Sequence, residues 1–248
     1  LINSYYGFGY DFEFVPVPVY VDSCGRKERN LQEANSITLV WYGRLCDFKV
    51  HSLIYLINKI NISVYKSRIK LIIIGDGDFK SLVEEVVAKI DFEVVLMGAI
   101  PNKVATNLIE READMVFAMG TSALEAGALG VPTVLMDASY SPINFPYGFS
   151  WLFETRQFSL GALVDRRTSY RGVLFDSLID ALFVNSDVLS RSCLEYVDRN
   201  HRLEKVVDLI CLACERSSMF FYDYAEVSSY RKPLILRVAA WFDFLRSK

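Results

Sequence analysis

The sequence predicts an α/β domain built as a three-layer, doubly wound parallel sheet with helices on both faces. Two observations predict this fold class. From Ser36 to Asp137, short apolar segments of the buried-strand type alternate with segments of helical apolar period, and the alternation is repeated four times. A glycine-containing turn follows each apolar segment. Because ligands of such sheets bind outside the carboxyl ends of the strands, we expect the functional residues in these turns.

The four strands share an apolar, β-branched composition that is typical of buried parallel strands. They are expected at Ile37–Tyr42, Lys70–Ile74, Glu93–Met97 and Met115–Ala118. The helix after the first strand has apolar residues at i, i+3, i+4 and i+7 from Val50, and the third helix begins at Pro101 and ends near Arg111. The fourth helix is short, because Gly130 ends it before Pro132 opens the next strand. A long loop and further helices at Leu174–Leu189 and Arg191–Glu215 are expected after it.

Composition narrows the class of protein. The chain has 248 residues, of which 52% are hydrophobic and 23% charged, which is typical of a globular domain rather than a disordered chain. A formal net charge of −3 and the absence of a basic run argue against nucleic acid as a partner. Five cysteines without a disulfide or zinc spacing indicate a reducing, cytoplasmic setting. No apolar run is long enough for a membrane-spanning helix.

The ends of the chain predict its organisation. Residues 1–35 contain an extended, proline-containing segment that indicates the end of a preceding domain or a linker, so the chain is expected to be a fragment of a longer protein. Residues 36–230 are expected to form the domain, and residues 231–248 an amphipathic helix with Trp241 and Phe242 in its apolar stripe. Such a helix packs on its own domain or docks on a membrane surface.

Two turns carry charged or polar residues suited to an anion. The turn Gly120-Thr121-Ser122 opens the fourth helix, and a helix N-terminus binds phosphate through its unpaired N–H groups and dipole. An ordinary helix cap is the alternative, and Ser122 with Glu125 also fits the S-x-x-E capping box. In the first turn, Arg44 and Lys49 are cations that would stabilise a departing diphosphate, and a solvated pair is the alternative.

Several of these segments together resemble one enzyme family. Gly43-Arg44-Leu45 followed by Lys49 resembles the GRL motif of the retaining family 4 glycosyltransferases, in which a K is the fourth residue after the L and whose architecture is called GT-B. The later landmarks of that family are matched in order at Ile72–Gly77, Val94–Gly98, Ala113-Asp114 and Leu124–Pro132.

The resemblance covers Ile37 to Asp137 and implies the C-terminal, Rossmann-like half of a GT-B enzyme, which binds the nucleotide-sugar donor. The N-terminal acceptor-binding half would then be missing from this chain, residues 1–35 would end the interdomain linker, and the isolated half would transfer nothing efficiently. The implied reaction moves a glycosyl group from a nucleoside-diphosphate sugar, by analogy UDP-sugar, to a polysaccharide or glycolipid. The implied location is the cytoplasm, with contact at the inner face of the membrane as an option.

The resemblance also assigns residue roles. The catalytic pair is Arg44 and Lys49, which stabilise the leaving diphosphate, and Glu125 accepts hydrogen bonds from both ribose hydroxyls. The remaining nucleotide-sugar-binding positions are Gly43, Gly98, Ile100, Gly120, Thr121 and Ser122. Gly98 and Ile100 correspond to the main chain that holds the base, for which a plain strand-to-helix turn is the alternative.

The chain departs from the family at two positions. Family members carry a second glutamate eight residues before Glu125, where this chain has Phe117, and the shorter loop resembles inverting GT-B enzymes, so the stereochemistry stays open. Val50 replaces the glycine that commonly follows the lysine. Asp76 and Asp78 form a D-x-D pattern, but a tight turn explains it better, and neither a metal nor a cofactor is predicted.

Two other functions remain as alternatives. A nucleotide-sugar epimerase of the same fold would need carboxylates and histidines around the sugar, and this chain has only His51 and His201. Neither histidine has a neighbouring nucleophile or orienting acid in sequence, so no acceptor base is predicted. A non-catalytic nucleotide-binding or membrane-docking module is the alternative from a different class.

Overall fold

The computed structural model describes residues 15–20, 31, 36–155, 158–167 and 172–216. The chain divides into two compact units. One unit, Val15–Val206, holds the sheet. The other combines residues 1–14 and 207–248, of which the structure describes only 207–216, the end of the last helix. The predicted amphipathic helix at 231–248 and most of the predicted linker at 1–35 lie outside the described residues.

A six-stranded sheet forms the centre of the larger unit, in the order β3-β2-β1-β4-β5-β6. The strands are β1 (Ile37–Tyr42), β2 (Ile69–Ile74), β3 (Glu93–Gly98), β4 (Met115–Ala118), β5 (Thr133–Leu135) and β6 (Ser150–Trp151). The first five strands are parallel, and β6 pairs antiparallel with β5. The predicted α/β, doubly wound fold class is therefore confirmed, and β1 and β4 have the predicted bounds.

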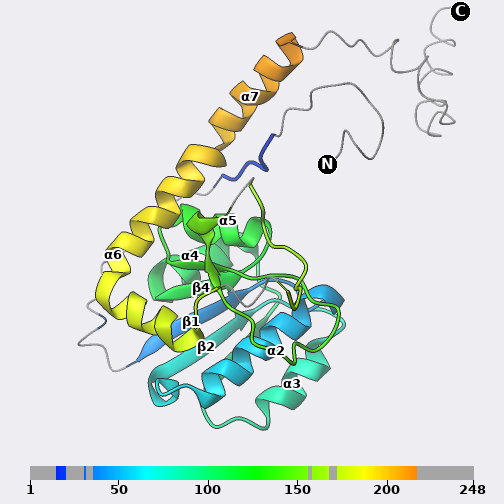
Figure 1. Cartoon of the computed structure of the whole chain (residues 1–248), viewed down its shortest axis with the longest axis vertical. Coiled ribbons are helices and arrows are strands. Elements are labelled where there is room, and N and C mark those ends of the chain that lie inside the picture. Colours follow the sequence, from blue (N-terminus) through cyan, green and yellow to red (C-terminus); the bar gives the residue numbers. More distant parts are fainter. Residues whose placement is uncertain (1–14, 21–30, 32–35, 156–157, 168–171, 217–248) are drawn as a thin grey trace, which may run out of the picture. The chain divides into compact units, whose positions relative to one another are not determined.

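Helices cover both faces of the sheet (Figure 1). The helices are α2 (Asp47–Ile62), α3 (Lys80–Val87), α4 (Asn102–Glu112), α5 (Thr121–Ala128), α6 (Phe175–Asn200) and α7 (Leu203–Arg216), with 3-10 turns at Lys66–Arg68 and Leu152–Glu154. Successive residues of β1 point to opposite faces: Trp41 joins the core cluster under α2 and α3, whereas Val40 joins the cluster under α4 and α5. Among the described helices, none is both long and apolar enough to cross a membrane.

The helical segment after the sheet differs from the prediction. A helix break was expected near residue 190, but α6 runs from Phe175 to Asn200 and only Asn185 has non-helical backbone angles (φ −135°, ψ 30°). Buried residues continue across the expected break, with Leu182, Leu189 and Cys193 on the inner side. The helix is kinked at Asn185, and the spacing of seven and four residues keeps one face of both its parts on the core.

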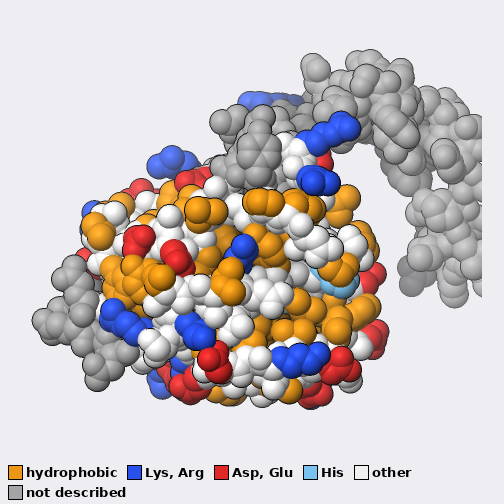
Figure 2. Space-filling model, turned by 60° about the horizontal axis from the view of Figure 1, so that its bottom comes forward, with side chains coloured by type: hydrophobic (Ala, Val, Ile, Leu, Met, Phe, Trp, Pro, Cys, Tyr) orange, Lys and Arg blue, Asp and Glu red, His pale blue; other side chains and the backbone are white. Residues whose placement is uncertain are grey.

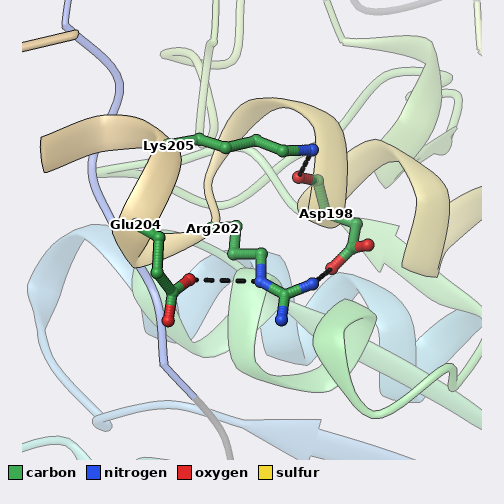
Figure 3. Close-up of polar contacts among 4 residues, drawn as sticks. All are labelled: Asp198, Arg202, Glu204 and Lys205. Atoms are coloured by element: carbon green, nitrogen blue, oxygen red, sulfur yellow. Dashed lines mark hydrogen bonds and ion pairs between the residues drawn. The ribbon is translucent and has the colours of Figure 1, made fainter. Parts of the chain in front are cut away.

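The turn between α6 and α7 forms hydrogen bonds with the extended segment around Val17 and Val19, which precedes the sheet. His201 is fully buried, its carbonyl accepts the Val19 N–H (2.8 Å), and its Nδ1 lies 2.8 Å from the Val17 carbonyl oxygen. On the outside of the turn, Arg202 pairs with Asp198 (3.3 Å) and Glu204 (3.1 Å), as Figure 3 shows. These exposed ion pairs close the turn.

The segment after β5, which was expected to be a long loop, contains a short strand and further backbone hydrogen bonds. Besides the short strand β6, Ala138 pairs with the segment that contains Ala162 and Val164 through hydrogen bonds of 2.7 and 2.8 Å. The Asp137 carboxylate accepts the Ala162 N–H (2.7 Å), and burial raises the pKa of this carboxyl above its ordinary value. The segment near Ala162 is thereby held beside the carboxyl end of the sheet.

Candidate functional site

The strand order reverses between β1 and β4, at the centre of the sheet. Tyr42, the last residue of β1, pairs with Ala118, the last residue of β4. On one side of this point the chain proceeds from β1 to β2 and β3, and on the other from β4 to β5. The loops after β1 and β4 diverge to opposite sides, and such a switch point is where doubly wound sheets bind ligands. The predicted residues Arg44, Lys49 and Glu125 follow these two strands.

The loop after β1 is held by the loop after β2. The Gly43 N–H donates to the Ile74 carbonyl (3.0 Å), and the Leu45 N–H donates to the Asp76 carbonyl (3.0 Å). The two loops approach so closely that a Cβ atom on Gly75 would lie 2.0 Å from the Gly43 carbonyl oxygen. Position 75 therefore requires glycine, and the loop after β2 fixes the backbone that carries Arg44.

Lys49 and Arg44 form a cationic pair at the start of α2. The Lys49 side chain is half-buried, and a Cβ atom on Gly43 would lie 3.5 Å from its Nζ. Burial lowers the pKa of the Lys49 ammonium, the charge of Arg44 lowers it further, and the nearby Cys46 acts in the opposite direction. Within the described part of the chain, neither cation forms an ion pair with a carboxylate. With no carboxylate partner in the described residues, the pair is suited to an anionic ligand.

The turn after β4 presents main-chain donors at the N-terminus of α5. Gly120 is the N-cap residue with φ 71°, and its own N–H donates to the Leu160 carbonyl (2.8 Å). That N–H is therefore already used. The N–H groups of Thr121 and Ser122, the first residues of the helix, have no hydrogen-bond acceptor among the described residues. These two donors, with the helix dipole behind them, are directed away from α5.

Glu125 is held by two residues from other elements. The Tyr42 hydroxyl donates to Glu125 Oε2 (2.8 Å), and the Asn102 side-chain amide donates to the same Oε2 (3.1 Å) and to the Tyr42 hydroxyl oxygen (3.0 Å). Burial, followed by the hydrogen bond to Glu125, raises the pKa of Tyr42 well above its ordinary value. No side chain caps α5, so the alternative interpretation of Ser122 and Glu125 as a capping box is wrong.

The predicted base-binding loop after β3 also lies at this edge. The Gly98 carbonyl accepts the Gly75 N–H (2.9 Å), and Ile100 is partly buried against the core under α4 and α5. Asp76 shapes the neighbouring turn, since its Oδ1 accepts the Gly77 N–H (2.8 Å) and its Oδ2 lies 3.8 Å from Lys80 Nζ. Among the residues that the structure describes, no cluster of three His, Cys, Asp or Glu side chains is arranged to hold a metal ion.

Two residues of the site were not predicted from the sequence. Tyr42 was assigned only to the strand and Asn102 only to the helix start, yet both contact Glu125. A weak signal exists for Tyr42, because it is a hydroxyl-bearing residue at the carboxyl end of an otherwise apolar buried strand. No local signal marks Asn102, whose contact with Glu125 joins two different helices.

Two hollows on the larger unit lie outside this site. One, of about 240 Å³, is formed by α2, the residues around Tyr147 and the start of α6. The other, of about 150 Å³, lies beside Val19 and Arg202. Neither is lined by a predicted site residue. The face drawn in Figure 2 carries single basic and acidic side chains among hydrophobic ones.

Comparisons with known proteins agree with this architecture. Residues 36–144 match the model of the family described as "Glycosyl transferases group 1". A search of curated proteins finds no match. A mutant of S. aureus TarM in complex with Fondaparinux, alpha-GlcNAc-glycerol and UDP is similar in structure, with 18% identity, a TM-score of 0.53, and coverage of 87% of this chain and 42% of that one.

Two further solved structures show the same fold. The lipopolysaccharide outer core galactosyltransferase WaaB has 13% identity and a TM-score of 0.50, over 82% of this chain and 55% of its own. The N-terminal domain of Candida albicans trehalose-6-phosphate phosphatase has 16% identity and a TM-score of 0.50, over 74% of this chain and 42% of its own. This chain therefore spans about half or less of the length of these similar structures.

The sheet order, the site at its switch point and the family match together define the class of domain. The chain has the Rossmann-like α/β fold of GT-B glycosyltransferase structures, and its residues 36–144 match the glycosyl transferases group 1 family. The segment that matches the glycosyl transferases group 1 family contains all four strand-to-helix turns of the candidate site.

Proposed function

We propose that this domain binds the nucleoside diphosphate of a nucleotide sugar at the switch point between β1 and β4, for transfer of the sugar to an acceptor. The observation that carries the proposal is the cationic pair of Arg44 and Lys49, which has no carboxylate partner among the described residues. A half-buried, unpaired ammonium is unfavourable in the free protein, and an anionic ligand removes this cost.

The chemistry of glycosyl transfer suits this arrangement. As the bond between the sugar and the diphosphate breaks, negative charge develops on the departing phosphate oxygen. Fixed cations such as Arg44 and Lys49 stabilise that charge without a proton, and electrostatic stabilisation of this kind accounts for most of the rate enhancement in many enzymes. The free N–H groups of Thr121 and Ser122 supply further donors to the diphosphate.

The other predicted residues bind the nucleoside. Glu125 accepts the ribose hydroxyls, as the acidic residue of a dinucleotide-binding fold does. The main chain from Gly98 to Ile100 lies beside the base, with Gly43 leaving space at the diphosphate. Uridine is the proposed nucleoside, because the structure of S. aureus TarM, which shares the fold, is of a complex with UDP.

The remaining parts of the proposal concern the whole protein. The acceptor is proposed to be a polysaccharide or glycolipid, and the reaction to take place in the cytoplasm, with contact at the inner face of the membrane. Another part of the protein is proposed to bind the acceptor, so this chain alone would bind donor and transfer little. The partial coverage of similar structures, 38% of the TarM chain in one case, supports the statement that another part of the protein is needed.

Isothermal titration of the chain with UDP, GDP and ADP tests the proposal. We expect one nucleotide to bind, its affinity to fall at least about tenfold in Arg44→Ala, and a smaller loss in Glu125→Ala. The matched control is Lys66→Ala, which also removes one cation but precedes β2, at the opposite end of the strands, where Lys66 pairs with Asp91 (2.8 Å). Absence of binding at millimolar nucleotide, or equal losses in Arg44→Ala and Lys66→Ala, contradicts the proposal.

A further inference from the structure

Tyr42, Asn102 and Glu125 form a closed triangle of side chains at the switch point. The three pairwise distances are 2.8, 3.0 and 3.1 Å. The members come from β1, from the first residue of α4 and from the second turn of α5. Each member belongs to a different element, so the position of the Glu125 carboxylate is fixed relative to the sheet and to both helices.

The ring of Tyr42 makes this triangle rigid. The ring packs against the core cluster under α4 and α5, which includes Val40 and Val116 of the two central strands. The phenolic oxygen lies at the carboxyl edge of the sheet, where it contacts Glu125 and Asn102. Tyrosine has few rotatable bonds, so a ring that packs on one side against the core restricts the position of its hydroxyl.

The hydrogen-bond chemistry assigns a direction to every contact. A carboxylate only accepts, so the Tyr42 hydroxyl must donate to Glu125 Oε2 and can then accept from Asn102. The Asn102 amide must turn its NH₂ group toward both oxygens, because its carbonyl would repel the carboxylate. Oε2 thus receives two donors, whereas Oε1 accepts no hydrogen bond from the described residues.

From this arrangement we infer that Tyr42 and Asn102 are positioning residues that hold Glu125 with one carboxylate oxygen directed at the ribose hydroxyls of the donor nucleotide. The inference rests on the proposed function. It adds positioning roles for Tyr42 and Asn102 and a preference of the site for ribonucleotides. The oxygen Oε1 keeps both lone-pair sites for the vicinal hydroxyls, and a nucleotide without these hydroxyls leaves it unpaired. The site therefore prefers ribonucleotides to dideoxyribonucleotides, and Tyr42 contributes to that preference without contacting the ligand.

A cycle that combines protein and ligand changes tests this role. The affinities of UDP and of 2′,3′-dideoxy-UDP are measured by calorimetry for the full chain, Tyr42→Phe, Asn102→Ala and Tyr65→Phe. The last variant is a matched control, because the Tyr65 hydroxyl also donates to a carboxylate, that of Asp180, but lies just before β2 at the opposite end of the strands. If GDP or ADP is the nucleotide that binds, it and its dideoxy analogue replace the uridine pair.

We expect Tyr42→Phe to weaken UDP binding about tenfold, the scale of one hydrogen bond to a charged group, and Asn102→Ala to weaken it by a similar factor. Binding of the dideoxy nucleotide should change less than about twofold in both variants, and Tyr65→Phe should change neither ligand. The two affinities are compared on the same folded protein, so any loss of stability affects both and cancels in their ratio.

The outcomes separate the inference from the proposed function. If the unmodified chain binds UDP but Tyr42→Phe weakens both nucleotides equally or neither, the positioning role is wrong and the donor site stands. If the unmodified chain binds UDP and its dideoxy analogue equally, Glu125 does not hold the ribose and the inference fails in the same way. If none of UDP, GDP and ADP binds, the proposed function fails and the inference with it.

Discussion

Replacing Gly75 by alanine tests whether the β2 loop fixes the backbone that carries Arg44. The added Cβ would lie 2.0 Å from the Gly43 carbonyl oxygen and 2.8 Å from its carbonyl carbon, and Gly75 has φ +148°. Ordinary contact requires a separation more than 1 Å greater, about 3.4 Å, so the loops must move apart. That movement disturbs two hydrogen bonds, from Gly43 N–H to Ile74 (3.0 Å) and from Gly75 N–H to Gly98 (2.9 Å).

The cost can be estimated from these two effects. Overpacking against rigid backbone costs about 1–3 kcal/mol and a positive φ about 1–2 kcal/mol, so Gly75→Ala should lower the free energy of unfolding by about 2–5 kcal/mol. Gly130→Ala is the control, because Gly130 also has positive φ (+68°) but a Cβ there meets nothing within 4 Å. The control should lose only about 1–2 kcal/mol.

Urea unfolding followed by circular dichroism measures both variants. We expect Gly75→Ala to be less stable than Gly130→Ala by about 1–3 kcal/mol, the cost of overpacking alone, and to bind nucleotide more weakly. Equal stabilities of the two variants would show that the loops are not in tight backbone contact.

Two further predictions concern titratable groups. Burial and the charge of Arg44 lower the pKa of Lys49, so the charged ammonium is unfavourable in the folded state at neutral pH. Lys49→Met should therefore raise the unfolding free energy of the ligand-free chain by about 1 kcal/mol or less. The same variant should bind nucleotide more weakly. A decrease in stability measured in urea would contradict this. Burial lowers the pKa of His201, so stability should fall as pH drops below the ordinary histidine pKa of about 6.5, where the unfolded state takes up the proton first. The melting temperature of His201→Gln should therefore depend less on pH between about 7 and 5, and an unchanged slope would show that His201 does not titrate as proposed.

Most of the sheet could be predicted from sequence because its signals are local. β1 and β4 are short apolar runs bounded by polar residues and glycine turns, and their predicted bounds match the structure. The strand β6, with only Ser150 and Trp151, has no period of its own and exists because it pairs with β5. The extent of α6 was also missed, because its continuation depends on packing against α5 rather than on a local stop signal.

The sequence could indicate the site residues that belong to a motif with a fixed spacing. It could not indicate residues that join the site only through contacts between distant elements. Arg44, Lys49 and Glu125 were located from motif spacing and all follow the two central strands. The hydrogen bond between Tyr42 and Glu125 joins residues 83 positions apart, and it depends on β1 being next to β4. The capping interpretation of Glu125 failed because α5 begins at Thr121 with Gly120 as its N-cap, two residues too early for Ser122 to be the cap.

Hydrogen exchange of the chain with and without saturating UDP would show whether the nucleotide binds at the switch point. We expect nucleotide to slow amide exchange in the loops after β1 and β4, at residues 43–49 and 120–125, and to leave the segment around Lys66 unchanged. Protection confined to the hollow formed by α2 and the start of α6, with no change in these two loops, would place the ligand elsewhere and contradict a donor site between β1 and β4.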